Sequence, residues 1–354
     1  MSRFLHPQYA GLEAYTPGEQ PRDRQYIKLN TNESPYPPAP AVLAALTEQD
    51  LADLRLYSDP EGTALRAKLA ELYGVEPGQV FLSNGSDDIL NFTFMAFGAD
   101  GAVFPALTYS FYPVFANLHG VAYETVPLRE DFTLDVAGMQ GKGKLTVFPN
   151  PNAPTGIALP LDQVEAIVAA NPDHVVVVDE AYVDFGADSA VPLLQKYENL
   201  LVVMTYSKSR SMAGARLGFA LGSRTLIQDL EKLKYSTNPY NVNRLTLKLG
   251  QAAVDSDGYF REKAREIMAT REKTAQALRA LGFTLPDSQA NFLFVTHPKV
   301  AGETLYRKCK EKGVLIRHFS DPAIAAYNRV TIGTPAEMEA FLAVVQTILK
   351  EEGA

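Results

Sequence analysis

The sequence has little cysteine, no surplus of positive charge and no long apolar run, and each absence excludes a class of protein. Its 354 residues include one cysteine, Cys309, which excludes an intrachain disulfide framework and metal sites built from several cysteines. A net charge of −8 argues against a general binder of nucleic acids or anionic membranes. No apolar stretch approaches the roughly 20 residues that span a bilayer, and residues 1–8 do not resemble a signal peptide. We therefore expect a cytoplasmic enzyme or binding protein without nucleic-acid or membrane partners.

The length of the chain predicts more than one domain. At ~150 residues per domain, 354 residues correspond to about two domains. The segment 29–40 contains four prolines, which remove backbone donors and restrict their neighbours, so it cannot form a regular helix. We expect an N-terminal arm over residues 1–45 that joins a small C-terminal domain at 259–354, and a large domain at 46–258.

Short apolar strands alternate with helical segments in the first two thirds of the chain. Strands are expected at 80–82, 145–148, 175–178 and 200–204, and helices at 62–73, 89–97, 161–170 and 191–197. Strands that are apolar along their whole length indicate a parallel sheet covered on both faces. After residue 258, long helices at about 260–281 and from 336 flank short strands at 290–295, 314–316 and 329–332. This pattern indicates a smaller α+β domain.

Polar residues follow each expected strand of the large domain, where ligands bind in an open parallel sheet. Gly85 lies at a helix start, and glycine permits close backbone approach while the first amides of the helix attract an anion. The alternative is a turn with a helix N-cap at Ser86 or Asp87. The second strand is followed by Asn-Pro-Asn-Ala-Pro-Thr-Gly at 150–156, which offers the amide of Asn152 or forms only a proline-fixed turn.

The next two strands end in groups of opposite charge. The strand at 175–178 delivers Asp179 to the rim of a dry sheet, where a carboxylate needs a cationic partner; a structural salt bridge is the alternative. The strand at 200–204 leads to Lys208, and Arg216 follows eight residues later. A neutral lysine amine attacks a carbonyl to form an imine, although most lysines after strands are only solvated. Together an anion cradle, an amide, a carboxylate and a lysine are the groups that pyridoxal phosphate requires.

Three motifs resemble signatures of class II, fold-type I aminotransferases. They are Ser-Lys-Ser-Arg-Ser-Met-Ala-Gly-Ala-Arg-Leu-Gly-Phe at 207–219, the run at 150–156, and Asp-Glu-Ala-Tyr at 179–182. Three further segments, at 29–35, 55–57 and 328–334, narrow the likeness to the histidinol-phosphate aminotransferase subfamily. The resemblance extends from about residue 10 to the C-terminus. It implies an α/β fold-type I pyridoxal-phosphate transferase, with a mostly parallel sheet in the large domain, that acts as a homodimer.

The resemblance also implies the roles of individual cofactor-binding residues. Lys208 would carry pyridoxal 5′-phosphate as a Schiff base and, once freed, move a proton between the substrate and the cofactor. Asp179 would pair with the pyridinium nitrogen. Tyr182 and Asn152 would hydrogen-bond the phenolic oxygen, and Tyr109 would stack on the ring. A phosphate cup would be formed by Gly85, Ser86, Asp87, Ser207 and Arg216, with Tyr57 added by the partner subunit.

Four more residues are implied at the substrate site. Arg329 matches an arginine that grips the α-carboxylate, and Arg317 matches one that contacts the phosphate of histidinol phosphate. The alternative for each is a surface cation. Asn32 and Asn291 would line the substrate site. No metal is implied.

The implied reaction exchanges an amino group between L-histidinol phosphate and 2-oxoglutarate, giving imidazole acetol phosphate and glutamate in histidine biosynthesis. Two half-reactions at one site predict ping-pong kinetics. Within the family, an aromatic amino-acid aminotransferase and a threonine-phosphate decarboxylase-like lyase stay open. A nucleotide-binding module that uses the Gly85 turn is a further alternative, although a glycine-rich fingerprint with its lysine is missing.

Overall fold

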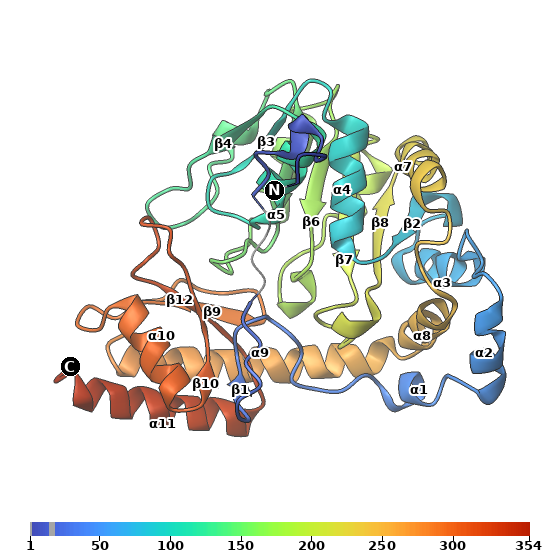
Figure 1. The fold of residues 1–354 in the computed structure, drawn as a ribbon. Coiled ribbons are helices and arrows are strands. Elements are labelled where there is room, and N and C mark those ends of the chain that lie inside the picture. Colours follow the sequence, from blue (N-terminus) through green and yellow to red (C-terminus); the bar gives the residue numbers. More distant parts are fainter. Residues whose placement is uncertain (1, 14–17) are drawn as a thin grey trace.

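A seven-stranded sheet lies at the centre of the molecule (Figure 1), in a computed structural model that describes residues 2–13 and 18–354. Its strands, in spatial order, are β2 (Val80–Ser83), β8 (Gly218–Gly222), β7 (Leu200–Thr205), β6 (Val176–Asp179), β5 (Leu145–Pro149), β3 (Ala102–Pro105) and β4 (Tyr123–Val126). Of these described strands, β8 runs antiparallel to both neighbours, and the other adjacent pairs are parallel. The mostly parallel sheet predicted from the sequence is confirmed.

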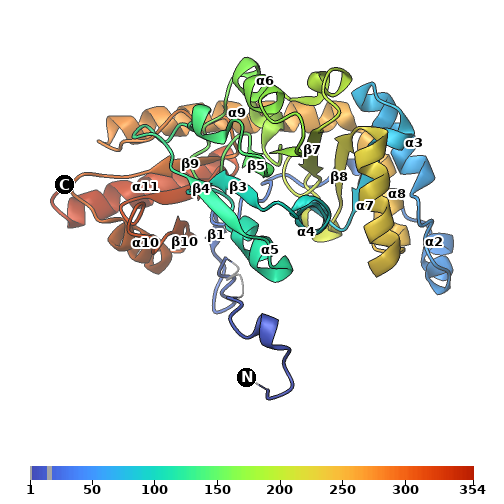
Figure 2. The same ribbon diagram turned by 90° about the horizontal axis from the view of Figure 1, so that it is seen from above.

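Helices cover both faces of this sheet. One face carries α4 (Ser86–Phe97), α5 (Phe111–His119) and α7 (Arg224–Thr237), and the other carries α3 (Thr63–Tyr73), α6 (Leu161–Ala169) and α8 (Arg244–Asp255). Figure 2 shows α4 and α5 on one side of the sheet and α6 on the other. Successive side chains of a strand point to opposite faces, so Val177 enters one core while Val176 and Val178 enter the other. This explains why the strands are apolar throughout.

The C-terminal part has its own sheets and its own core. Its helices are α9 (Asp257–Ala280), α10 (Gly302–Glu311) and α11 (Pro335–Glu351). A three-stranded antiparallel sheet, called here the C-terminal sheet, contains β11 (Arg317–His318), β12 (Asn328–Thr331) and β9 (Phe292–Val295). A separate parallel pair joins β1 (Ile27–Lys28) to β10 (Val314–Leu315), so the N-terminal segment packs against the end of the chain. In Figure 1, α9 extends from the C-terminal part, where α11 lies below it, to beneath the large sheet.

Short elements complete the described chain. They are α1 (Pro40–Leu43), α2 (Glu48–Ala52), η1 (Pro7–Tyr9), η2 (Asp53–Arg55), η3 (Pro77–Gln79), η4 (Ala137–Met139), η5 (Val183–Phe185), η6 (Val191–Gln195) and η7 (Ala213–Ala215), where η marks a 3₁₀ turn. The helix expected at 191–197 is therefore the 3₁₀ turn η6, which has a proline in its first turn. Residues 1 and 14–17 of the expected arm lie outside the described residues. Over the described part of the chain, no helix combines the length and apolarity needed to cross a membrane.

Candidate active site

The carboxyl ends of β5, β6 and β7 and the start of α4 surround a cavity of about 170 Å³. Parallel neighbouring strands end at the same edge of a sheet, so the polar segments that follow them meet there. Eight residues singled out from the sequence line this cavity: Ser86, Asp87, Tyr109, Asp179, Tyr182, Ser207, Lys208 and Arg216. We call this space the lysine cavity. It also receives Thr31 and Glu33 from the N-terminal segment, which the sequence did not single out.

Asp179 is a buried carboxylic acid at the end of β6. Its side chain accepts hydrogen bonds from the Tyr112 hydroxyl at 2.9 Å and from the Ala181 N–H at 3.2 Å. Burial raises its pKa to about 6, even though both hydrogen bonds and the charge of Lys208 act in the opposite direction. A buried carboxylate of this kind is stabilised when a cation lies beside it, so Asp179 is suited to a positively charged ligand. Tyr112 was not predicted from the sequence; it lies three residues after Tyr109, in the first turn of α5, and its closeness to Tyr109 was the available signal.

Lys208 reaches the same cavity from the segment after β7. Its Nζ donates a hydrogen bond to the carbonyl of Thr31 at 3.4 Å and lies 5.7 Å from the ring centroid of Tyr182. The Tyr182 hydroxyl accepts a hydrogen bond from Asn32 Nδ2 at 2.9 Å. The described contacts therefore leave the amine half-buried beside an aromatic ring and a neutral carbonyl, where it can reach a ligand in the cavity.

The start of α4 forms a cradle for an anion. Gly85 has a φ of +90°, and a Cβ there would lie 2.6 Å from Nη2 of Arg216. A Cβ at Gly218 would lie 2.5 Å from the backbone N of Ser86, so the two glycines let β8 and the helix start approach each other. Among the described residues, no side chain caps α4, and its first amides stay available to a ligand.

Arg216 supplies a cation beside that helix start. Its guanidinium donates to Asp87 Oδ2 at 3.0 Å and to Ser207 Oγ at 3.4 Å, while the Tyr109 hydroxyl donates to Asp87 Oδ1 at 2.7 Å. Its backbone adopts a φ of +53°, in the left-handed region. A guanidinium together with free helix amides is the arrangement that binds phosphate.

The three asparagines predicted for the site do not line the lysine cavity. Asn152 donates from Nδ2 to the Leu107 carbonyl at 3.1 Å, and its buried Oδ1 has no hydrogen-bond partner among the described atoms. Asn32 is fully buried and holds Tyr182, while Asn291 donates to the Asn32 carbonyl at 3.0 Å. The two asparagines thus lie behind the cavity wall and support it.

Tyr57 lies on the surface, away from the lysine cavity. Its side chain is 77% exposed, and its ring stacks on Tyr240 at 4.5 Å between centroids. The carbonyl of Tyr57 accepts a hydrogen bond from Arg244. A role for Tyr57 in a cofactor site therefore depends on a second copy of the chain.

A second cavity, of about 450 Å³, adjoins the first and shares Tyr109 and Ala153 with it. Arg317 and Arg329 both line this cavity, which we call the arginine cavity. They are directly opposite each other on β11 and β12. Like charges in that register repel, so an anion bound between them is favourable.

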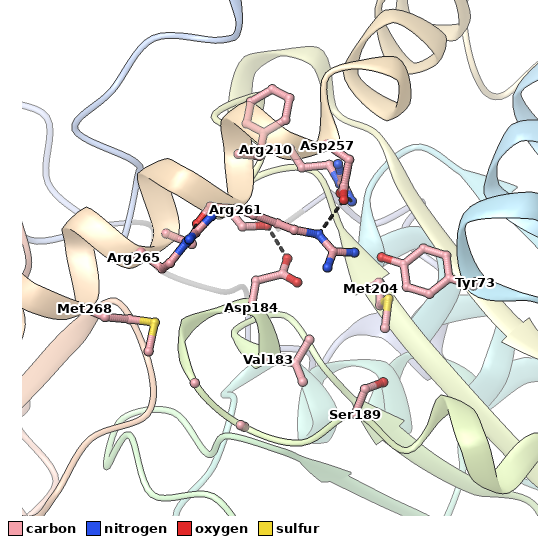
Figure 3. A pocket seen from close by; sticks show the side chains of 15 residues that line it. Tyr73, Val183, Asp184, Ser189, Met204, Arg210, Asp257, Arg261, Arg265 and Met268 are labelled. Atoms are coloured by element: carbon pink, nitrogen blue, oxygen red, sulfur yellow. Dashed lines mark hydrogen bonds and ion pairs between the residues drawn. The ribbon is translucent and has the colours of Figure 1, made fainter.

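A third cavity, of about 480 Å³, lies behind the lysine segment (Figure 3). Its walls hold none of the residues that the sequence singled out. Arg210 is buried there and pairs with Asp257 at 2.8 Å, and Arg261 faces the same carboxylate. Ser209 donates to Asp184 on the same side. These contacts fix the two residues that follow Lys208, so they stabilise the lysine segment from behind.

The sequence matches the family model of aminotransferase class I and II over residues 24–345. The histidinol-phosphate aminotransferase of Brachyspira hyodysenteriae is 48% identical over 353 residues, with 99% of this chain and 100% of that protein covered. The histidinol-phosphate aminotransferase 1 of Bordetella parapertussis is 48% identical over 353 residues, with 98% and 99% covered.

Solved structures agree with this match. The crystal structure of histidinol-phosphate aminotransferase from Sinorhizobium meliloti, in complex with pyridoxal 5′-phosphate, superposes with a TM-score of 0.87 at 25% identity and covers 99% of this chain and 98% of that one. L-threonine-O-3-phosphate decarboxylase from Porphyromonas gingivalis gives a TM-score of 0.80 at 20% identity, with 92% and 99% covered. The second match reports on the fold alone.

Proposed function

The chain belongs to the class I and II aminotransferase family, and from this premise we propose that it transfers the amino group of L-histidinol phosphate to 2-oxoglutarate. The family membership, the fold-type I architecture and the aminotransferase activity predicted from the sequence are confirmed by the relatives, which match over their full length. The observation that carries the proposal is the lysine cavity, in which Lys208, the buried Asp179 and an uncapped helix start surround one space.

The described residues fit pyridoxal 5′-phosphate as the cofactor. The helix start and Arg216 match a phosphate, and the buried Asp179 matches a protonated ring nitrogen. When bound, this cofactor supplies an aldehyde that condenses with amines and a ring that accepts electrons released at the substrate Cα. We propose that it is held by the cofactor residues predicted from the sequence: Gly85, Ser86, Asp87, Tyr109, Asn152, Asp179, Tyr182, Ser207, Lys208 and Arg216.

Proton transfer at the substrate Cα is assigned to Lys208. Its amine lies at the end of a flexible side chain and is held by the carbonyl of Thr31, so it can exchange one contact for another without moving the backbone. Asp179 in its ionised form keeps the ring nitrogen protonated. Tyr182, held by Asn32, presents its hydroxyl at the wall of the same cavity.

Substrate binding is assigned to the arginine cavity. Arg329 would grip the α-carboxylate of glutamate and Arg317 the phosphate of histidinol phosphate. Because the two substrates use one site in turn, the same pair of guanidinium groups must accept both a carboxylate and a phosphate. Buried Asn291 and Asn32 would shape this region by holding the N-terminal segment in place.

A homodimer is part of the proposal. Several large apolar side chains are exposed on α1, α2 and the segments near Tyr57: Leu43, Leu51, Leu54, Leu56, Tyr57 and Tyr240. An exposed apolar patch of this kind marks a protein interface. A second copy of the chain would cover it and bring its Tyr57 to the phosphate of the first. The division into an arm (1–45), a large domain (46–258) and a small domain (259–354), and a cytoplasmic location, complete the proposal.

A panel of amino donors tests this function. Purified protein loaded with pyridoxal phosphate is assayed with 2-oxoglutarate and histidinol phosphate, phenylalanine, tyrosine or O-phosphothreonine. We expect the highest kcat/KM with histidinol phosphate and one glutamate formed per donor consumed. A higher kcat/KM with the aromatic amino acids, or release of carbon dioxide from O-phosphothreonine without a keto acid, would contradict the proposal. Sedimentation of the same sample as a monomer would contradict the dimer.

A further inference from the structure

Phe132 lies in the loop between β4 and β5 and has an unusual backbone conformation. Its φ is +65°, in the left-handed region that bulky residues rarely adopt. Among the described residues, the other non-glycine residues with positive φ are Asn32, Ser211 and Arg216. Asn32 and Arg216 contact the walls of the lysine cavity, and Ser211 lies three residues after Lys208. Strained backbone of this kind persists where the surrounding structure enforces it, often at functional sites.

The turn around Phe132 is fixed by its own hydrogen bonds. Arg129 N–H donates to the Thr133 carbonyl, and Phe132 N–H donates to the Arg129 carbonyl, both at 2.9 Å. Asp131 accepts hydrogen bonds from the backbone N–H of Thr133 at 3.0 Å and from its hydroxyl at 2.6 Å. Buried Leu134 anchors the turn in the core of the large sheet. The Phe132 ring is therefore held by a rigid part of the large domain.

The ring of Phe132 packs against two rings of the C-terminal part. Its centroid lies 5.6 Å from Phe294 and 5.2 Å from Tyr327, with interplanar angles of 84° and 86°. Phe294 and Tyr327 stack on each other at 4.5 Å. Two edge-to-face contacts onto one stacked pair are favourable and directional, so they define where the C-terminal sheet lies relative to the turn.

The contacted ring belongs to the same row of residues as the two arginines. Phe294 on β9 is directly opposite Arg329 on β12, and Arg329 is directly opposite Arg317 on β11. Directly opposite residues point to the same face of a sheet, so the three side chains form one row. Phe319 also connects Phe294 to Arg317. The ring centroids of Phe294 and Phe319 are 6.1 Å apart, and the Arg317 guanidinium lies 6.0 Å from the centroid of the Phe319 ring.

We infer that Phe132 is a positioning residue that sets the distance between the substrate-binding arginines and the lysine cavity. The lysine and Asp179 come from the large sheet, whereas Arg317 and Arg329 come from the C-terminal sheet. Substrate must contact both groups at once, so the relative position of the two sheets controls the affinity for substrate. Phe132 fixes this relative position, and it lines neither the lysine cavity nor the arginine cavity. The inference rests on the proposed function, in which the two arginines bind the anionic groups of the substrates.

The test measures substrate affinity separately from cofactor affinity. The half-reaction of the cofactor-loaded enzyme with L-glutamate is followed through cofactor absorbance in wild type, Phe132→Ala, Phe132→Gly and Phe132→Tyr. We expect Phe132→Ala and Phe132→Gly to raise the half-saturating glutamate concentration about tenfold, because both remove the ring. Phe132→Tyr, which keeps it, stays within about twofold of wild type. The limiting rate and the Kd of pyridoxal phosphate change less than about twofold in all three variants.

A matched control and a clear contrary result complete the test. Phe97 is also half-buried but packs on the sheet face covered by α4, so Phe97→Ala removes a similar ring without changing glutamate affinity. Wild-type glutamate affinity in Phe132→Gly would overturn the inference, and so would an equal loss of cofactor and glutamate affinity in Phe132→Ala. If Phe132→Ala does not fold, Phe132→Gly and Phe132→Tyr decide between these results. Glutamate is also the partner if the second substrate is an aromatic amino acid, so failure with histidinol phosphate alone would reject the proposed function and leave this test intact.

Discussion

Replacing Asp179 with Asn is expected to make the cofactor-free protein more stable above about pH 6 while lowering its activity. Asp179 is 4% exposed, and burial raises its pKa from 3.8 to about 6. Below pH 3.8 the carboxyl group is neutral in both the folded and the unfolded protein. Between pH 3.8 and 6 the unfolded chain releases the proton and the folded one keeps it, so wild-type stability falls as pH rises. Asn carries no titrating proton, and its contribution stays constant.

The size of this effect follows from the pKa. With about 1.4 kcal/mol for each tenfold change in proton affinity, the wild type loses about 3 kcal/mol between pH 3.8 and 6. An unfolding entropy of about 2.1 cal/mol/K per residue gives about 0.74 kcal/mol/K for 354 residues, so this loss corresponds to about 4 °C in Tm. Asn has one acceptor oxygen where the carboxylate has two, so the variant loses the hydrogen bond from either Tyr112 or Ala181, which costs about 1 kcal/mol. The variant is then slightly less stable near pH 4 and about 3 °C more stable near pH 7.

Thermal unfolding of both cofactor-free proteins from pH 4 to 8 measures the difference directly. The neighbouring Glu180, whose pKa burial raises to about 8, is present in both proteins and largely cancels from it. Adding pyridoxal phosphate is expected to reverse the order above pH 6, because the cationic ring stabilises the wild-type carboxylate. A Tm difference that does not change with pH would refute the claim that burial raises the pKa of Asp179 in the cofactor-free protein.

Three further substitutions have separable outcomes. Arg317→Ala raises the KM for histidinol phosphate at least about tenfold more than the KM for phenylalanine, because it removes one charged contact to phosphate. Steady-state kinetics with both amino donors measures this difference, and equal effects on the two KM values would contradict the role of Arg317. Gly218→Ala places a Cβ 2.5 Å from Ser86 N and lowers pyridoxal phosphate affinity about tenfold or more in a spectral titration; unchanged affinity would separate this contact from the phosphate cup. Tyr57→Phe weakens cofactor binding a few fold. In mixed dimers in which one subunit carries Arg216→Ala, the site that keeps Arg216 should bind the cofactor with normal affinity only when the other subunit carries Tyr57. Normal affinity at that site with Tyr57→Phe in the other subunit would argue against the shared site.

The strand ends were predictable because their pattern is local. Four consecutive valines require a strand with both faces buried, and such a strand can deliver Asp179 only to its rim. The apolar runs that became β7 and β2 likewise predict Lys208 after β7 and an anion site at the start of α4. Strand β8 was not predicted, because glycine, which stands at both of its ends, is unfavourable in strands. The structure explains Gly218 by its close approach to the start of α4.

The remaining features depend on contacts between distant parts of the chain. The N-terminal segment reaches the lysine cavity through Thr31 and Glu33, and Asn32 turns inward with a φ of +58° to hold Tyr182. Neither the backbone conformation nor the partner 150 residues away has a signature in the local sequence. The same holds for Phe132, whose ring is explained only by Phe294 and Tyr327.

Covalent trapping tests the central claim most directly. Reduction of the cofactor-loaded protein with borohydride, followed by proteolysis and mass spectrometry, is expected to place one pyridoxyl phosphate on the peptide that contains Lys208. Lys208→Ala should show no such adduct and almost no turnover. An adduct on another lysine, or full activity of Lys208→Ala, would contradict the account.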